Sequence, residues 1–360
     1  MLSGRMSSGF LLTLALLFVL SVMLAACGDK DEEQTEENQE TKPRIGLVID
    51  SGTENDRGFN QYSLEGARRA AEAGGIEFTY LTSQSTSDYE AHVESLVQEA
   101  VDLVITIGFR MGDATSRAAQ RHPEISFAIV DNAYFPGSGC PETVEDCYTE
   151  AGGLSNVTSL MFAEDQVSYL AGTLAACMSE TGKIATVAGV EIPPVVRFVV
   201  GFETGAKNFN PDIETMHRYI PDFDDSATGG VVGQGFINDD ADIIFGAGGN
   251  TGNGGILAAH DADLMAIGVD VDQYFSYPEI APSLLTSAAK NMDIAVENAV
   301  RDFLNGELQS GIRVATLENG GVGLAPFHDW EDRIPQECKD AVDAARQAVI
   351  DDPAITGYVP

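Results

Sequence analysis

Short apolar runs alternate with segments of helical periodicity along most of this chain. The first apolar run, 44–50, is too short for a helix, and the segment 59–73 after it has apolar residues at helical spacing before Gly74-Gly75. The alternation continues with strand patterns at 77–82, 102–108 and 126–131 and helical patterns at 87–99 and 112–121. Because strands separated by helices pair in parallel, we expect an α/β fold with a doubly wound parallel sheet.

A second series of the same kind follows a long loop. Its strand patterns lie at 157–162, 183–189, 213–219, 241–246 and 264–270, and its helical patterns at 164–178, 195–208, 228–237 and 252–260. After a short run at 284–287, helices are predicted at 288–305 and 335–350. The same alternation of strands and helices thus occurs twice, and a chain of this length has room for two lobes.

Two such series predict two similar lobes with a ligand cleft between them. We expect the chain to cross between them three times, near Val157, Thr286 and Gly320. Lobe I would then comprise 44–157 plus 287–319, and lobe II 158–286 plus 320–360. Lobes joined by a three-strand hinge can close on a ligand.

The N-terminus has the pattern of a lipoprotein signal peptide at 1–26. Arg5 precedes a long apolar run, and Leu24-Ala25-Ala26-Cys27 resembles a bacterial lipobox, whose cysteine thiol is diacylated. The alternative is a transmembrane anchor, although the run has only about the minimum length for spanning. The acidic segment 27–43 has no apolar face and predicts a disordered tether. We therefore expect a protein that is anchored to the cell membrane through Cys27, on the extracytoplasmic face.

The net charge and the motifs exclude several classes of function. A net charge of −36 repels phosphate backbones, so nucleic acid is not expected as a partner. No CxxC occurs and the histidines are scattered, so no metal site is predicted. The glycine run 246–252 has the spacing GxGxxxG, which is not that of a dinucleotide-binding fingerprint. No catalytic motif such as GxSxG or HExxH is present, and neither an enzyme nor a cofactor is indicated.

Four cysteines remain besides Cys27, an even number that suits an oxidising compartment. Cys140 and Cys147 flank a short loop and are expected to pair locally. Cys177 and Cys338 would then join a helix to the C-terminal tail. Two other pairings of these four cysteines remain open.

Acidic residues stand at the ends of three predicted strands, namely Asp50, Asp131 and Asp270. Ligands of open α/β sheets bind beyond the carboxyl ends of the strands, where one carboxylate can accept two hydroxyls of a sugar. The alternative for Asp50 and Asp131 is that they cap the next helices. Lys290 could neutralise one acid and donate to ligand oxygens, or it could be an ordinary surface lysine.

Aromatic residues follow several of the same strands. Phe59 lies after the first strand, and Phe198, Phe202 and Phe223 lie near strand ends of the second series. Base stacking on such rings contributes about 1 to 3 kcal/mol each. The alternative for each is a place in the core.

Motifs at the strand ends also occur in a distinctive order. They are Ile49-Asp50-Ser51-Gly52, Asn55-Asp56-Arg57-Gly58-Phe59-Asn60-Gln61, Ile192-Pro193, Arg197-Phe198, Gly201-Phe202, the glycine-rich stretch 248–254, Gly268-Val269-Asp270-Val271-Asp272-Gln273, Leu285-Thr286-Ser287 with Lys290, and 319–324. From about Arg44 to about Asp352 the chain resembles the basic membrane protein (BMP) family, PnrA-like substrate-binding lipoproteins of ABC importers. The resemblance implies a type I periplasmic-binding-protein-like fold and a purine nucleoside as ligand.

The resemblance also implies a role for each site residue. Asp50 and Asn60 would hydrogen-bond the base, and Phe59 would stack on it, with Phe202, or alternatively Phe223 or Phe198, on the other side. The ribose would be held by Asp131, Gly248, Asp270 and Lys290. The sequence departs from the family at Asn250, which is inserted in the glycine motif, and in the loop 134–150, which is longer than expected.

The function implied is that of a monomeric receptor that closes on a nucleoside and delivers it to a permease with its ATPase subunits. A simple sugar or another solute, such as a riboflavin-like compound, is an alternative ligand because a fold does not determine specificity. A membrane-anchored sensor or adhesion lipoprotein is a second alternative, and an enzyme is the third.

Overall fold

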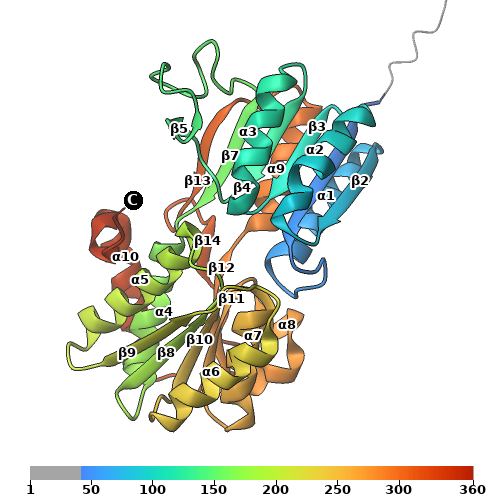
Figure 1. Ribbon diagram of the computed structural model, residues 1–360. Helices are drawn as coiled ribbons and strands as arrows, with labels where there is room; N and C mark the ends of the chain where they lie inside the picture. Colours follow the sequence, from blue (N-terminus) through green and yellow to red (C-terminus); the bar gives the residue numbers. More distant parts are fainter. Residues whose placement is uncertain (1–41, 360) are drawn as a thin grey trace, which may run out of the picture. The chain divides into compact units, whose positions relative to one another are not determined.

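The computed structural model describes residues 42–359 of the chain (Figure 1). The predicted signal peptide at 1–26, the predicted lipidation site Cys27 and the predicted tether up to Thr41 lie outside the described residues. Within 42–359, no helix is long and apolar enough to cross a bilayer.

Six parallel strands form the first sheet, in the order β13-β7-β4-β3-β1-β2. The strands are β1 (Arg44–Ser51), β2 (Glu77–Ser83), β3 (Leu103–Ile107), β4 (Ser126–Val130), β7 (Val157–Phe162) and β13 (Gly311–Ala315). Helices cover both faces: α1 (Phe59–Gly74) packs with α9 (Met292–Leu304), and α2 (Tyr89–Gln98) with α3 (Gly112–Arg121). Consecutive residues of β1 therefore pack on opposite faces of the sheet. Leu47 lies in the core with α1, and Val48 lies in the core with α2. We call this sheet and these helices lobe I.

The second sheet has the order β14-β12-β11-β10-β8-β9 and is parallel except for β14, which is antiparallel to β12. Its strands are β8 (Lys183–Ala188), β9 (Glu214–Tyr219), β10 (Ile243–Ala247), β11 (Met265–Asp270), β12 (Leu284–Lys290) and β14 (Val322–Leu324). The helices are α4 (Glu164–Met178), α5 (Pro193–Phe209), α6 (Ser226–Asn238), α7 (Gly249–Asp261), α8 (Gln273–Ser276) and α10 (Gln336–Asp351). We call this second unit lobe II (Figure 1). The predicted doubly wound α/β fold with two lobes is confirmed.

Helices α4 and α5 of lobe II pack with their backbones nearly in contact. A Cβ atom added at Gly172 would lie 1.9 Å from the carbonyl oxygen of Phe202, and one at Gly205 would lie 2.0 Å from that of Tyr169. Only glycine fits at these positions, because any side chain would force the helices apart.

The predicted helix at 288–305 is wrong at its start. Strand β12 continues to Lys290, and α9 begins at Met292. Ala288 and Ala289 pair with β11 on one side and with β14 on the other. The hydrogen bonds of two neighbouring strands override the helix propensity of alanine here. The short edge strands β13 and β14 were not predicted.

The chain crosses between the lobes after Phe162, after Lys290 and between β13 and β14. Because β7 pairs in the first sheet and β12 pairs in the second, the first two crossings come a few residues after the predicted Val157 and Thr286. The predicted boundaries therefore assign most of β7 to lobe II and the end of β12 to lobe I, which the strand pairing corrects. The third crossing includes Gly320.

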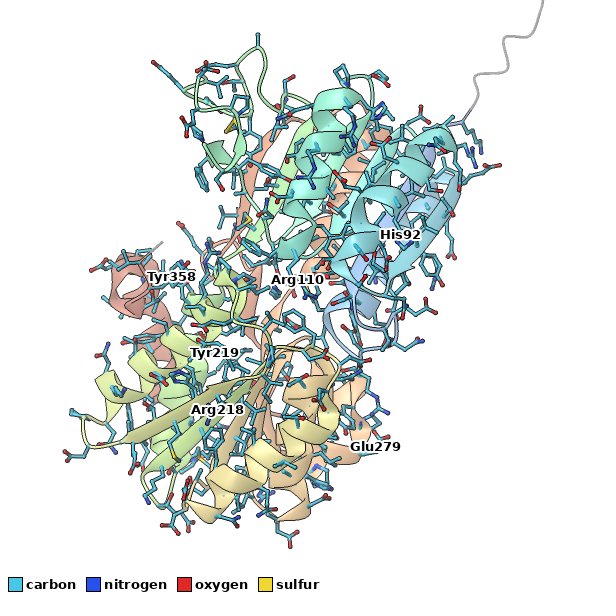
Figure 2. The ribbon with its side chains drawn as sticks, viewed as in Figure 1. His92, Arg110, Arg218, Tyr219, Glu279 and Tyr358 are labelled. Carbon is cyan, nitrogen blue, oxygen red and sulfur yellow. A yellow bond between two sulfur atoms is a disulfide. The ribbon has the colours of Figure 1, made fainter. Side chains whose placement is uncertain are left out.

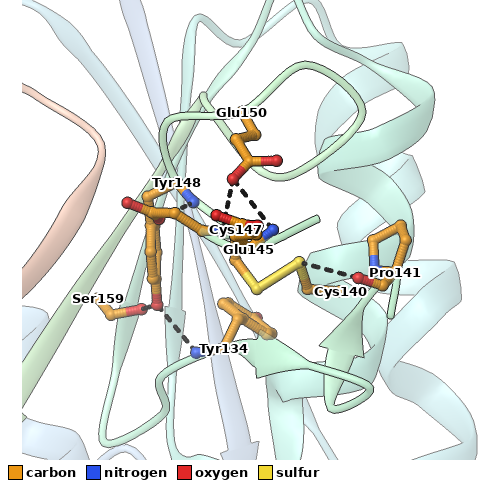
Figure 3. Close-up of a disulfide and its surroundings, with 9 residues drawn as sticks. Tyr134, Cys140, Pro141, Glu145, Cys147, Tyr148, Glu150 and Ser159 are labelled. Carbon is orange, nitrogen blue, oxygen red and sulfur yellow. Dashed lines mark hydrogen bonds between the residues drawn. A yellow bond between two sulfur atoms is a disulfide. The ribbon is translucent and has the colours of Figure 1, made fainter. Parts of the chain in front are cut away.

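Between residues 42 and 359 there are two disulfides, Cys140–Cys147 and Cys177–Cys338, with Cα–Cα distances of 5.8 and 5.7 Å. The first closes the long loop after β4 (Figure 3). In that loop the hydroxyl of Tyr148 accepts a hydrogen bond from the backbone N–H of Tyr134 at 2.9 Å. This hydrogen bond connects the later part of the loop to its beginning. The second disulfide joins α4 to α10.

Candidate functional site

A cavity lies between the two lobes, at the carboxyl ends of strands from both sheets. In this structure the cavity leaves about 70 Å³ of space for a water-sized probe. Lobe I lines it with Asp50, Ser51, Gly52, Thr53, Asp56, Phe59, Asn60, Gly108, Phe109 and Asp131, and lobe II with Ile192, Pro194, Val195, Phe198, Phe223, Asp224, Gly248, Gly249, Asn250, Val269, Asp270 and Lys290.

The cavity brings together every predicted ligand-binding residue except Phe202. The ring of Phe202 is 1% exposed and packs on Phe245, with the two ring centroids 4.9 Å apart. It is a core residue of lobe II, because its place on α5 faces the sheet. Phe198, one helical turn earlier, lines the cavity instead.

Lys290 is at the centre of a buried cluster of charges. Its ammonium lies 2.7 Å from Asp131 Oδ2, 3.2 Å from Glu164 Oε1 and 4.0 Å from Asp270 Oδ1. These four side chains are all less than a tenth exposed. The surface-lysine alternative is therefore wrong, and one ammonium is shared by acids from both lobes.

Glu164 was not predicted from the sequence. It is the first residue of α4, just after β7, and it is fully buried. Its second oxygen, Oε2, lies 3.4 Å from the guanidinium of Arg197. Like Asp50 and Asp131, Glu164 lies close to the end of a strand, here β7, and this position is the signal for it in the sequence.

Burial changes the proton affinity of this cluster. It raises the pKa of Asp270 to about 7, which the charge of Lys290 opposes and the charge of Asp131 reinforces. Burial also raises the pKa of Glu164, again against the effect of Lys290. For Lys290 itself, burial lowers the pKa, but the three acids outweigh this effect and the net shift is upward. The ammonium therefore stays charged at neutral pH.

Asp131 and Asp270 occupy matching positions in the two lobes. Asp131 directly follows β4 of lobe I and Asp270 ends β11 of lobe II. Both have left-handed backbone conformations, with φ of +66° and +68°. Non-glycine residues seldom adopt this conformation, and where it occurs it is often part of a functional site.

Asp50 and Asp131 pair with cations, and at the start of α1 another acid accepts from the backbone N–H groups. Asp56 accepts hydrogen bonds from the backbone N–H groups of Gly58, Asn60 and Gln61 at the start of α1. Burial raises the pKa of Asp56 despite these hydrogen bonds. Asp50 instead pairs with Arg110, 3.0 Å from its Nη2 atom.

Two buried oxygen atoms that belong to cavity-lining residues, Asn60 Oδ1 and Asp131 Oδ1, have no hydrogen-bond partner within the described part of the chain. The Asn60 amide is oriented by its Nδ2 atom, which donates to the carbonyl of Thr53 at 3.2 Å. An unsatisfied buried acceptor is costly, about 1 to 3 kcal/mol. Each oxygen can therefore accept a hydrogen bond from a bound ligand.

Two glycines that follow neighbouring strands of lobe II, Gly189 after β8 and Gly248 after β10, make room for an aromatic ring. Gly248 has a φ of +137°, and a Cβ atom there would lie 2.5 Å from the backbone nitrogen of Gly189. A Cβ atom at Gly189 would in turn lie 2.6 Å from the ring of Phe223. Gly248 and Gly189 thus bring two strand ends together and leave space for Phe223 to line the cavity.

Residues 42–352 match the model of a protein family described as "ABC transporter substrate-binding protein PnrA-like". The chain belongs to this PnrA-like (Bmp) family of ABC transporter substrate-binding proteins. Among its relatives is the "ABC transporter nucleoside-binding protein BmpA" of Lactococcus lactis, 30% identical over 91% of this chain and 93% of that protein. The "CD4+ T-cell-stimulating antigen" of Listeria innocua is 29% identical over 95% of this chain and 96% of that protein.

Solved structures show the same fold for this Bmp-family chain. An ABC transporter solute-binding protein from Aeropyrum pernix K1 has a TM-score of 0.76 and 25% identity, covering 86% of this chain and 91% of that one. Another from Conexibacter woesei has a TM-score of 0.66. The fold is that of type I periplasmic binding proteins. Proteins of this family bind substrates for a transporter rather than catalyse a reaction, so the partners are a ligand and a permease.

Proposed function

We propose that this Bmp-family protein binds a purine nucleoside in the interlobe cavity and delivers it to an ABC permease from the extracytoplasmic face of the membrane. The observation that carries the proposal is the position of Lys290. Its ammonium lies 2.7 Å from Asp131 and 4.7 Å from the centroid of the Phe59 ring. A polar contact for a sugar and an aromatic surface for a base thus meet within one cavity. The nucleoside-binding name of the Lactococcus lactis relative supports this ligand class.

In this proposal the ribose lies against Asp131, Asp270 and Lys290, beside Gly248. The free Oδ1 atom of Asp131 accepts a ribose hydroxyl, and Asp270 accepts another. Such charge-assisted hydrogen bonds contribute about 1.5 to 3 kcal/mol each. The ammonium of Lys290 donates to a ribose oxygen and balances the acids.

The base lies among Phe59, Phe198 and Phe223, which line the cavity from both lobes. Stacking on rings of this kind favours any base, since every base has a π face. Asn60 supplies selectivity, because its Oδ1 atom is buried and accepts a hydrogen bond from the edge of the base.

The test is thermal unfolding of residues 42–360, which form a compact unit by themselves, with nucleosides, free bases, ribose and other sugars. A ligand at about 100 times its Kd stabilises the protein by about 2.7 kcal/mol. We expect selective stabilisation by adenosine, guanosine or inosine. A shift with sugars alone would favour the sugar-receptor alternative and contradict the nucleoside.

Two matched pairs of variants locate the binding. Asp270→Ala and Phe59→Ala should abolish the nucleoside shift. Asp263→Ala and Phe209→Ala, which change an exposed turn acid and a 42%-exposed ring outside the cavity, should retain it. Loss of the shift in all four variants would argue against binding in this cavity.

Membrane anchoring through Cys27 is part of the same proposal. In a bacterial host, the full chain should label with radioactive palmitate and sediment with membranes. Cys27→Ala should remove the label. A wild-type protein without label would contradict lipidation and leave the nucleoside test unaffected.

A further inference from the structure

Both carboxylate oxygens of Asp50 are already engaged by donors within the protein. Arg110 donates from Nη2 to Oδ1 at 3.0 Å and from Nε to Oδ2 at 3.2 Å. The hydroxyl of Tyr89 and the backbone N–H of Ser51 also donate to Oδ1. Three of these donors converge on Oδ1 and one reaches Oδ2, so both oxygens are engaged within the protein. Asp50 lines the cavity, but as one half of an ion pair with Arg110 it presents no net charge to a ligand.

The pairing of Asp50 with Arg110 is built into the backbone. Arg110 follows β3 in the same short segment as Gly108, whose φ is +111°. A Cβ atom at Gly108 would lie 2.8 Å from Asp50 Oδ2, so the carboxylate fits only beside glycine. The fork of Arg110 then meets both carboxylate oxygens, the geometry in which arginine binds an acid most firmly.

Arg110 also reaches across to lobe II. Its Cζ atom lies 5.3 Å from the centroid of the Phe223 ring, where a planar guanidinium can stack on the aromatic face. Figure 2 shows Arg110 at the border between the two lobes. One side chain thus contacts an acid of lobe I and a cavity aromatic of lobe II.

We infer that Arg110 is a specificity-determining residue of this site, an inference that rests on the proposed nucleoside function. By occupying Asp50, Arg110 removes a carboxylate from base recognition and leaves Asn60 Oδ1 to accept from the base edge. A single neutral acceptor requires only one donor of the base. Guanosine and inosine differ by the 2-amino group of guanine, and while Arg110 neutralises Asp50 that group gains no charged partner from Asp50. The wild-type protein should therefore bind guanosine and inosine with similar affinity.

Arg110→Met tests this inference, because methionine keeps much of the length and the contact with Phe223 but frees Asp50. The freed carboxylate can accept the 2-amino group of guanine. We expect the preference for guanosine over inosine to rise by about tenfold or more, the effect of one charge-assisted hydrogen bond. The measurement is isothermal titration calorimetry of both nucleosides with residues 42–360.

Arg110→Lys is a second, milder variant, and Arg313→Met is the control. Lysine keeps the charge but not the fork, so it should free part of Asp50 and give a smaller change in the same direction. Arg313 is partly exposed and paired with Asp302 at 2.7 Å, and it does not line the cavity, so its loss should leave the preference unchanged.

An equal loss of affinity for both nucleosides in the Arg110 variants would indicate a structural role and overturn the inference. An unchanged preference would overturn it too, with the proposed function intact. Failure of the wild-type protein to bind any nucleoside would overturn both, and this outcome is separate because it is seen before any variant is made.

Discussion

The ammonium of Lys290, at the end of β12 in lobe II, lies 2.7 Å from the carboxylate of Asp131, which follows β4 in lobe I. Both side chains are buried, at 2% and 4% exposure. The same ammonium contacts Glu164, where the chain enters lobe II after β7. One buried cation therefore joins acids from both lobes beside two of the three chain crossings.

Replacing this cation should destabilise the protein strongly. Lys290→Met leaves buried carboxylates without their ammonium, and removing one partner of a buried ion pair costs about 3 to 5 kcal/mol. Urea unfolding at pH 8 measures the loss. Lys207→Met is the control, since Lys207 is 52% exposed and 3.7 Å from Glu203, and its loss should change stability by less than about 0.5 kcal/mol. Equal effects of the two changes would contradict the role given to Lys290.

The raised pKa of Asp270 predicts a pH dependence with a definite sign. Burial raises this pKa to about 7, so between about pH 4 and pH 7 the folded state holds more protons than the unfolded state. Asp270 therefore lowers the free energy of unfolding as the pH rises through this range. Each unit of difference in pKa corresponds to about 1.4 kcal/mol.

Asp270→Asn should remove the part of the decrease in the free energy of unfolding that comes from Asp270. We expect the stability of the variant relative to wild type to increase from about pH 4 to about pH 7 and to level off above. Urea unfolding at a series of pH values provides the comparison, and Glu164 adds the same trend to both proteins. Parallel curves for the two proteins would show that Asp270 titrates normally.

The contact between α4 and α5 predicts opposite effects of one substitution at two helical glycines. Gly172→Ala places a methyl group 1.9 Å from the carbonyl oxygen of Phe202 and should cost at least about 1 to 3 kcal/mol. Gly235→Ala in α6 meets no atom within 4 Å and should stabilise by about 0.5 to 1 kcal/mol. Thermal unfolding distinguishes the two. Stabilisation by both substitutions would mean that α4 and α5 are farther apart than in this structure.

The two disulfides should differ in their contribution to stability. Cys177 and Cys338 are 161 residues apart and Cys140 and Cys147 are 7 apart. By loop-closure entropy, the first stabilises by about 5 kcal/mol and the second by about 2.5 kcal/mol. Replacing each pair with serine and measuring unfolding in urea tests the order. A larger loss from the short loop would contradict the entropic account.

Much of the candidate site could be predicted because strand ends are visible in the sequence. Asp50, Asp131 and Asp270 each follow an apolar run, and parallel strands bring their carboxyl ends to one edge. Phe198 and Phe202 show the limit of this reasoning. Both lie on α5 one turn apart, and which of them faces the cavity depends on how the helix is rotated against β10.

The sequence by itself determined the order of strands and helices, the division into two lobes and the family, because these depend on local periodicity and on motifs that are continuous in the chain. Only the tertiary structure decided where the chain crosses between the lobes, since pairing with β11 and β14 outweighs the helix propensity of Ala288 and Ala289. It alone also decided the partners of the charges. Asp50 and Arg110 are 60 residues apart, as the separation in their hydrogen bond shows, and Lys290 is 126 residues from Glu164. Tertiary packing brings these distant residues together, and no local pattern in the sequence records which of them meet.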